Sequence, residues 1–166
     1  MKVLFLDIDG VLNCMYPTPS QDRDWVDLDE WRYGFNPDLV ARLRHVVFKT
    51  GCKIVVSSSW RHHTSYAPYQ PYRNWRDVLA EMLHKTRDEL FVGETPMDNS
   101  GKRGLEIMEW LSMHEDVTDY CVVDDETVDI EPYIDKKRIV KIDMKTGLTG
   151  ADACCIIDVL NKGEQK

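Results

Sequence analysis

The sequence lacks three features that would assign it quickly to a class of protein: paired metal-binding cysteines, a long apolar run and an excess of positive charge. Its five cysteines form no Cys-x-x-Cys pair, so neither a zinc site nor a disulfide framework is indicated, and we expect all five to be free and buried. The net charge of −8 disfavours broad nucleic-acid binding through a basic surface, although it leaves room for a local basic site.

No stretch approaches the length of a membrane span, and the apolar start is short and ends in acids. We therefore expect no signal peptide, no membrane partner and a reducing compartment, the cytoplasm. The chain also lacks an internal repeat, a low-complexity segment and a linker. With 166 residues, 43% of them hydrophobic, it is predicted to form a single domain over residues 1–166 with a core that needs no disulfides.

Short apolar runs alternate with helical patterns along the chain. The runs that predict buried strands cover residues 3–6, 53–56, 90–92, 120–123 and 138–142. Capping residues and apolar periodicity predict helices over 37–50 and 75–84, from 101, and from 149. In the helix from 101, we expect Leu105, Met108 and Leu111 on one face, with Ile107 beside them. This order predicts a three-layer, Rossmann-like α/β fold in which helices cover both faces of a parallel sheet.

The most informative stretch is the first strand and the turn after it. Four apolar residues, Val3–Leu6, precede Asp7 and Asp9, and Gly10 then lets the backbone turn sharply. A calcium-binding loop would need a third oxygen ligand two residues after Asp9, where the chain has Val11. An ordinary strand-ending turn stays an alternative. Open α/β sheets bind ligands at this position, so the stretch predicts a protein that handles phosphate with a metal.

Polar side chains follow three of the predicted strands, and they are Asp7, Ser57–Ser59 and Asp124–Asp125. Because the carboxyl ends of parallel strands lie at one edge of a sheet, we expect these groups to meet there. Oxygen ligands rich in carboxylates suit Mg²⁺, and an ionised aspartate can attack phosphorus. A serine hydroxyl can donate to a phosphate oxygen, and Lys102–Arg103 supplies a cation for the transferring phosphoryl group.

Four stretches resemble the motifs of the haloacid dehalogenase (HAD) superfamily of phosphohydrolases. Asp7–Asn13 resembles the first motif, Val55–Ser59 the second, Lys102–Gly104 the third and Val122–Asp125 the fourth. They occur in the family's order and together span most of the chain. The large cap domains of the family have no room here. The chain is therefore similar to a small capless member, like the HAD phosphatase domains of nucleic-acid (RNA) repair proteins.

The resemblance implies a role for each motif residue. Asp7 would be the nucleophile, and Asp9 would protonate the leaving oxygen and then activate water. Mg²⁺ would be held by the Asp7 carboxylate, the Asp9 backbone carbonyl and Asp124, with Asp125 beside it. Among the three serines we choose Ser58, because a hydroxyl residue two places before tryptophan resembles related sequences. For the cation, Lys102 and Arg103 both stay open.

Two segments are left to choose a substrate, residues 14–35 and 60–76. The second contains no acid and interleaves cations with rings: Trp60, Arg61, His62, His63, Tyr66, Tyr69, Tyr72, Arg73, Trp75 and Arg76. Cations for phosphates and rings for bases are typical of nucleotide or single-strand binding, so we expect Ser59, Trp60, Arg61 and His62 to contact the substrate. The alternative is a loop whose aromatic rings pack on the core.

These observations lead to one main hypothesis and two alternatives. The main hypothesis is a Mg²⁺-dependent phosphatase of a phosphomonoester, with a small-molecule phosphate ester, a nucleotide or a nucleic-acid end as its substrate. A phosphotransferase could use the same site, and a catalytically silent phosphate-binding or regulatory module could use the same fold. Asp9 disfavours the silent module, since binding alone needs no general acid. The sequence leaves the oligomeric state open.

Overall fold

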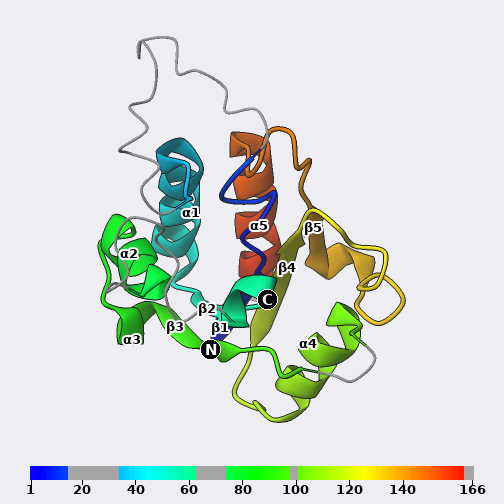
Figure 1. The fold of residues 1–166 in the computed structure, drawn as a ribbon. Helices are drawn as coiled ribbons and strands as arrows, with labels where there is room; N and C mark the ends of the chain where they lie inside the picture. The colour runs from blue at the N-terminus through cyan, green and yellow to red at the C-terminus, as the bar shows by residue number, and fades with distance from the viewer. Residues whose placement is uncertain (15–33, 63–73, 98–100, 163–166) are drawn as a thin grey trace.

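A parallel sheet of five strands forms the centre of the molecule. The computed structural model describes residues 1–14, 34–62, 74–97 and 101–162. The strands are β1 (Lys2–Leu6), β2 (Lys53–Val56), β3 (Phe91–Glu94), β4 (Asp119–Asp124) and β5 (Ile139–Lys141). They lie in the order β3-β2-β1-β4-β5, and every neighbouring pair is parallel. The predicted parallel sheet is confirmed, with β1 at its centre (Figure 1).

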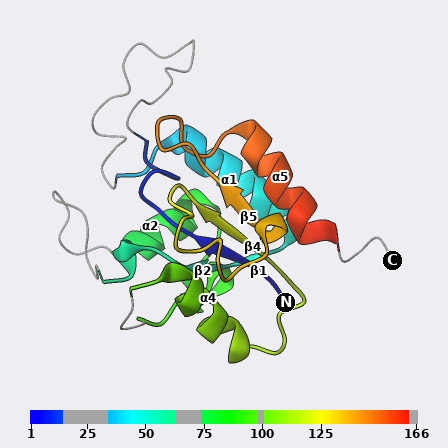
Figure 2. The ribbon, with the colours of Figure 1, turned by 90° about the vertical axis from the view of Figure 1, so that its right-hand side faces the viewer.

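Helices cover both faces of this sheet, as the sequence predicts. They are α1 (Pro37–Thr50), α2 (Trp75–Met82), α3 (Arg87–Leu90), α4 (Arg103–Ser112) and α5 (Gly150–Asn161), with short 3₁₀ turns η1 (Ser59–His62) and η2 (Lys136–Arg138). Leu4 and Leu6 of β1 face the core that α1, α2 and α5 complete, whereas Val3 and Phe5 face α4 on the other side (Figure 1 and Figure 2). This division follows from the alternation of side chains along a strand.

The register of the strands brings three polar strand ends to the same level. Leu6 of β1 pairs with Val56 of β2 and with Val123 of β4. The residues that come next are Asp7, Ser57 and Asp124. The pairing continues past the strand, because the backbone N–H of Asp7 donates to the carbonyl of Val123 at 3.0 Å. The polar groups that the sequence places at strand ends therefore share one edge of the sheet.

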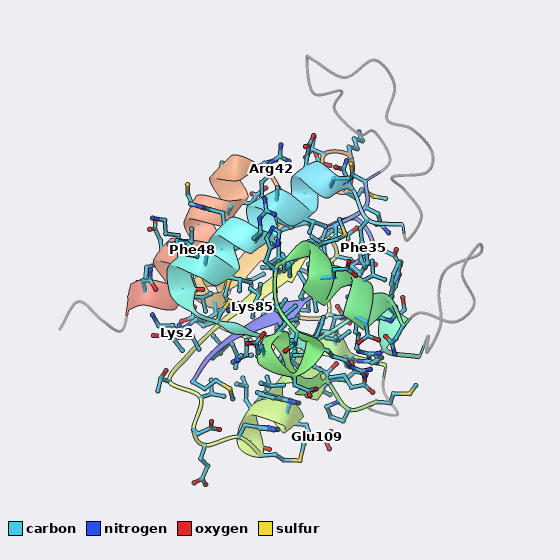
Figure 3. The ribbon with its side chains drawn as sticks, turned by 90° about the vertical axis from the view of Figure 1, so that its left-hand side faces the viewer. Lys2, Phe35, Arg42, Phe48, Lys85 and Glu109 are labelled. Carbon is cyan, nitrogen blue, oxygen red and sulfur yellow. The ribbon has the colours of Figure 1, made fainter. Side chains whose placement is uncertain are left out.

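Helix starts follow the capping signals of the sequence. The Asn36 side chain accepts a hydrogen bond from the backbone N–H of Asp38 at the start of α1, and Thr149 forms a capping box with Asp152 at the start of α5. On the outer side of α1, Phe48 is 81% exposed (Figure 3). The helix α3 was not predicted, because four residues are too few to carry a periodic pattern.

The inner face of α4 differs from the prediction. Its buried residues are Gly104, Glu106, Ile107 and Trp110, whereas Met108 is 47% exposed and Leu105 and Leu111 are only partly buried. The helix is therefore rotated relative to the predicted face. A buried glutamate takes a place that apolar periodicity would not assign to it.

The cysteines are free, as predicted, but they are not all buried. Cys52 and Cys121 lie in the core, and Cys14 is partly buried, whereas Cys154 and Cys155 are exposed. The prediction was wrong for the last two because α5 turns Ala153 and Ile156 inward, which leaves the positions between them on the outside.

In the described part of the chain, no helix is long and apolar enough to cross a membrane. The same part contains no large cap over the sheet edge. Most of the two segments proposed for substrate selection lies outside the described residues, including His63, Tyr66, Tyr69, Tyr72 and Arg73.

Candidate active site

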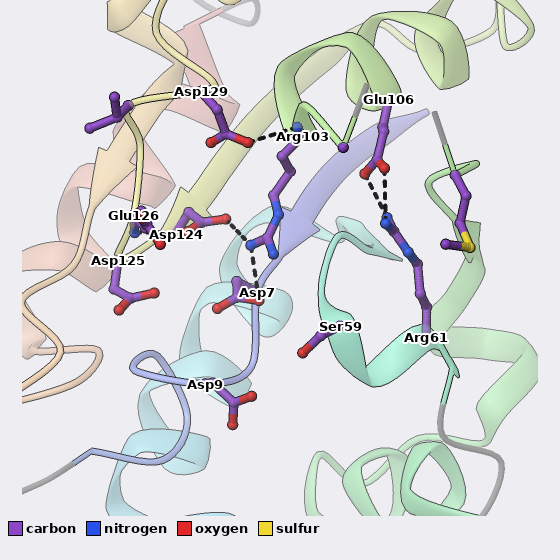
Figure 4. A pocket seen from close by; sticks show the side chains of 13 residues that line it. Asp7, Asp9, Ser59, Arg61, Arg103, Glu106, Asp124, Asp125, Glu126 and Asp129 are labelled. Carbon is purple, nitrogen blue, oxygen red and sulfur yellow. Dashed lines mark hydrogen bonds and ion pairs between the residues drawn. The ribbon is translucent and has the colours of Figure 1, made fainter. Parts of the chain in front are cut away.

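A cavity of about 600 Å³ opens at the edge where the strand ends meet (Figure 4). Among the described residues that line it, seven acids face two arginines. The acids are Asp7, Asp9, Glu106, Asp124, Asp125, Glu126 and Asp129, and the arginines are Arg61 and Arg103. A cavity with this surplus of negative charge attracts cations and needs one before it can hold a phosphate.

Three of these carboxylates crowd together at the sheet edge. Oxygen atoms of Asp7, Asp124 and Asp125 lie within 4.8 Å of one another, and Asp7 and Asp124 are only 5% and 1% exposed. Burial and the neighbouring Asp124 raise the pKa of Asp7 to about 7, and burial raises the pKa of Asp124 to about 6. Burial also raises the pKa of Asp125. The cluster therefore carries negative charge that its own surroundings do not neutralise.

Arg103 is the cation that contacts this cluster. It begins α4, and its Nη1 atom lies 2.6 Å from Asp124 and 3.1 Å from Asp7 (Figure 4). Its backbone N–H donates to the carboxylate of Asp129 at 2.9 Å, which fixes the start of the helix. Although burial lowers it, the pKa of Arg103 is raised overall by Asp124 and Asp7. One guanidinium thus serves several acids.

Lys102, the other cation left open by the sequence, points elsewhere. Its Nζ atom donates to the hydroxyl of Tyr133 at 3.2 Å and lies over the Tyr133 ring. The close approach of α4 to this region depends on Gly104, where a Cβ would lie 2.7 Å from the Tyr133 ring and 2.8 Å from the carbonyl of Asp129. The geometry therefore favours Arg103 over Lys102 for the motif position.

Asp9 has surroundings very different from those of Asp7. It is exposed, and each of its carboxylate oxygens accepts one hydrogen bond, from Asn13 at 2.8 Å and from the indole of Trp60 at 2.9 Å. Gly10 has φ +73, and a Cβ there would lie 2.6 Å from the Asp125 carboxylate. Only glycine lets the turn after β1 approach the Asp125 carboxylate this closely.

The three serines after β2 differ in burial. Ser57 and Ser58 are each 1% exposed, whereas Ser59 is exposed and lines the cavity. A hydrogen bond from the Ser58 hydroxyl to Asp7 acts against the rise in the pKa of Asp7. The Ser57 hydroxyl has no partner among the described residues. Ser58, the serine chosen from the sequence, thus contacts Asp7, and its role towards phosphate stays a prediction.

The two described tryptophans of segment 60–76 belong to the core. Trp60 is 7% exposed and Trp75 is fully buried, and their ring centroids lie 5.6 Å apart. The ring centroid of Phe35 lies 5.4 Å from that of Trp60. For these rings the structure follows the alternative in which they pack on the core, because so little of either ring is left for a base to stack on.

The described arginines of the same segment are paired with acids. Arg61 donates two hydrogen bonds to Glu106, at 2.7 and 2.9 Å (Figure 4). It donates a third to the hydroxyl of Thr95 at 2.6 Å. Arg76 lies 2.5 Å from Glu94 and stacks over the ring of Trp75. Neither guanidinium is placed as an open phosphate site. The side chain of His62 lies outside the described part of the structure.

Sequence reasoning did not identify Glu106, Thr95 or Asp129. Glu106 lies one helical turn after Arg103, so both point from α4 toward the cavity, and that spacing is the signal that could have found it. Asp129 and Thr95 lie in connections without a recognisable motif. Their partners, Arg103 and Arg61, are distant in sequence, so no local pattern predicts these contacts.

The acids fit the magnesium ion that the resemblance implies. The three clustered side chains, Asp7, Asp124 and Asp125, offer only carboxylate oxygens, which are the donors that Mg²⁺ prefers over softer ions. Their raised pKa values indicate that a further positive charge would stabilise the ionised forms. The residues present therefore suit a hard divalent cation.

Comparison with known families gives a match over most of the chain. The sequence model of the family described as "HAD domain in Swiss Army Knife RNA repair proteins" matches residues 3–153. No curated protein and no solved structure matches the chain. The matched range includes β1, the serines after β2, the start of α4 and the acids Asp124 and Asp125 at the end of β4.

Proposed function

The chain belongs to the family of HAD domains in Swiss Army Knife RNA repair proteins, and on this basis we propose that it is a Mg²⁺-dependent phosphatase. It hydrolyses a phosphomonoester through an aspartyl-phosphate intermediate. A nucleic-acid end or a nucleotide is the proposed substrate, because the family is one of RNA repair proteins. The cytoplasm is the proposed compartment.

One observation carries this proposal: the two acids after β1 have opposite surroundings. Asp7 is buried against Asp124 and Arg103, where a nucleophile can be held in place beside a metal. Asp9 is exposed at the same cavity and is held only by neutral donors. Two carboxylates in contrasting environments are the arrangement that lets one act as nucleophile while the other exchanges a proton.

In the first step, an oxygen of Asp7 attacks phosphorus and the bond from phosphorus to the leaving oxygen breaks. Asp9 donates its proton to that oxygen, so the leaving group departs as a neutral hydroxyl. Arg103 and the Ser58 hydroxyl are placed to stabilise the transferring phosphoryl group. Asp7, Asp124, Asp125 and the Asp9 backbone carbonyl would hold a bound Mg²⁺, which would supply positive charge to offset the acids and the phosphate.

In the second step, Asp9 removes a proton from water, and the water oxygen bonds to phosphorus. The bond from phosphorus to Asp7 breaks, which releases inorganic phosphate and restores the Asp7 carboxylate. Asp9 is protonated again and ready for the next turnover. The exposed position of Asp9 supports this role, since water and the leaving group both reach it from the cavity.

A phosphate-release screen tests the proposal. The purified chain with Mg²⁺ is offered mononucleotides, sugar phosphates and oligonucleotides that carry a 3′ or a 5′ phosphate, and Asp7→Asn is run beside it as the blank. We expect release that depends on Mg²⁺ and on Asp7, with the oligonucleotides or nucleotides preferred. No release of phosphate from any substrate would favour the phosphate-binding module. Transfer of the phosphoryl group to an added alcohol would favour the phosphotransferase.

A further inference from the structure

The Trp60 side chain makes a hydrogen bond to Asp9 that its packing in the core does not require. We propose that Trp60 is a positioning residue, which holds the Asp9 carboxylate in place for both of its proton transfers. This inference rests on the proposed function, because it concerns the acid that serves the leaving group. It assigns Trp60 a role different from the base stacking expected from the sequence.

The contact ties together two separate segments of the site. The Trp60 Nε1 atom, in η1 after β2, lies 2.9 Å from one oxygen of Asp9 in the turn after β1. Asn13 lies 2.8 Å from the other oxygen. Asn13 belongs to the same turn as Asp9, so Trp60 alone among these two donors anchors the carboxylate to another part of the sheet edge.

The chemistry of the two donors suits an acid that must change its protonation state. An indole N–H and an amide N–H are neutral, and the indole can only donate. Each carboxylate oxygen that accepts one such bond keeps a second lone pair, on which a proton can sit. Trp60 can therefore hold Asp9 both as the acid and as the carboxylate. A lysine or arginine there would favour the ionised form strongly.

Trp60 is itself held rigidly. Its ring is 7% exposed and packs against Phe35 and Trp75. The indole of Trp75 donates to the carbonyl of Trp60 at 3.2 Å, and the backbone N–H of Trp60 donates to the Ser58 hydroxyl at 3.3 Å. Since Ser58 is also bonded to Asp7, one turn after β2 holds both acids of the mechanism.

The test removes the indole N–H while keeping an aromatic ring. Trp60→Phe is compared with Trp110→Phe, which changes a buried tryptophan on the α4 face, away from Asp9. Each is assayed with p-nitrophenyl phosphate, whose leaving group needs little protonation, and with glycerol phosphate, whose leaving group needs a proton. We expect Trp60→Phe to lower kcat/KM, which reports only the steps up to departure of the leaving group, by about threefold to tenfold for glycerol phosphate and by less for p-nitrophenyl phosphate. The kcat falls for both substrates where the second step limits turnover, because Asp9 also removes the proton from water.

Two further measurements separate positioning from packing. In an Asp9→Asn background, Trp60→Phe should cause no additional loss in kcat, because the proton transfer it supports is already gone. In a ¹⁵N spectrum of the chain, Asp9→Ala should move the indole resonance of Trp60 and leave that of Trp110 in place. The spectrum needs no stable Trp60 variant, so the proposal stays testable even where Trp60→Phe fails to fold.

Equal losses of kcat/KM on both substrates, an additive loss in the Asp9→Asn background or an unmoved Trp60 resonance would each overturn the positioning role. A wild-type chain without phosphatase activity would instead overturn the proposed function. The spectrum would then still report whether the hydrogen bond exists, so the two failures are distinguishable.

Discussion

Two arginines line the same cavity, and their surroundings are opposite. Arg61 meets one carboxylate, Glu106, through two parallel hydrogen bonds, and the side chains are only 11% and 4% exposed. Arg103 contacts two carboxylates, Asp124 and Asp7, and its side chain is 25% exposed. Asp125 adds a third acid beside them. The first pair is balanced and closed, whereas the second cluster is short of positive charge and open to the cavity.

The difference separates what holds the site from what acts in it. In this pair the two charges offset each other and are buried together, and the two parallel hydrogen bonds fix η1 against α4. A cluster with too few cations gains stability from any ligand that supplies more, which is the condition for binding Mg²⁺ and a phosphate. On this view, changes at Arg103 and its acids alter activity, and changes at Arg61 and Glu106 alter stability.

The largest effect is expected at the acidic cluster itself. Asp7→Asn should lower phosphate release by several orders of magnitude, because an amide oxygen is a poor nucleophile. The variant should fold, since it removes a charge that burial and the neighbouring Asp124 destabilise. Phosphate release and thermal melting, measured side by side, check both halves. Normal turnover by Asp7→Asn would contradict the assignment.

The second largest effect distinguishes Arg103 from its neighbour Lys102 as the cation of the site. Arg103→Gln should lower kcat by about 10²- to 10³-fold, because it removes a donor aimed at the transferring group. Lys102→Gln is the matched control, since Lys102 contacts Tyr133 instead of the acids, and its activity should stay close to that of the wild type. A larger loss in Lys102→Gln than in Arg103→Gln would reverse the assignment of the cation.

Breaking the Arg61–Glu106 pair should lower the stability of the fold. Glu106→Gln leaves Arg61 buried without its counter-charge, which should lower the free energy of unfolding by about 3–5 kcal/mol. Glu109→Gln, exposed on the same helix, is the control and should change it by no more than about 0.5 kcal/mol. Denaturant unfolding measures both. A Glu106→Gln protein as stable as the Glu109→Gln control would mean that the pair does not fix α4.

The smallest effect concerns pH in the absence of metal. The folded-state pKa values of Asp7 and Asp124, about 7 and about 6, exceed the unfolded value of about 3.9, so the folded chain binds more protons across this window. With chelator present, the melting temperature should therefore fall as pH rises from about 4 to about 7. Added Mg²⁺ should raise it near pH 7.5 and have little effect near pH 4.5. A melting temperature that rises across this window in chelator would show that the acids are not destabilised by burial.

The sequence predicted the parts of the site that follow from local pattern. The apolar run before Asp7, the turn at Gly10 and the helix caps at Asn36 and Thr149 are encoded by neighbouring residues, and the structure has them where expected. The parallel register then brings Asp124 to Asp7 without any further signal.

The parts that sequence reasoning missed depend on partners far apart in the chain. Arg61 was assigned to substrate because its neighbours in sequence are cationic and aromatic, but it pairs with Glu106, 45 residues later. The same pairing buries a glutamate on α4 and turns the predicted face, with Met108, outward. Trp60 was likewise expected to stack on a base, whereas the fold directs its indole to Asp9.

The proposed function depends most directly on the phosphorylation of Asp7 during turnover. The wild-type chain is mixed with Mg²⁺ and the best substrate from the screen, quenched in acid within one turnover, and its N-terminal peptide is analysed by mass spectrometry. We predict a peptide that carries one phosphoryl group on Asp7, that loses it on treatment with hydroxylamine, and that is unmodified in Asp7→Asn. Hydrolysis at the full rate with no phosphorylated peptide at any quench time would contradict it.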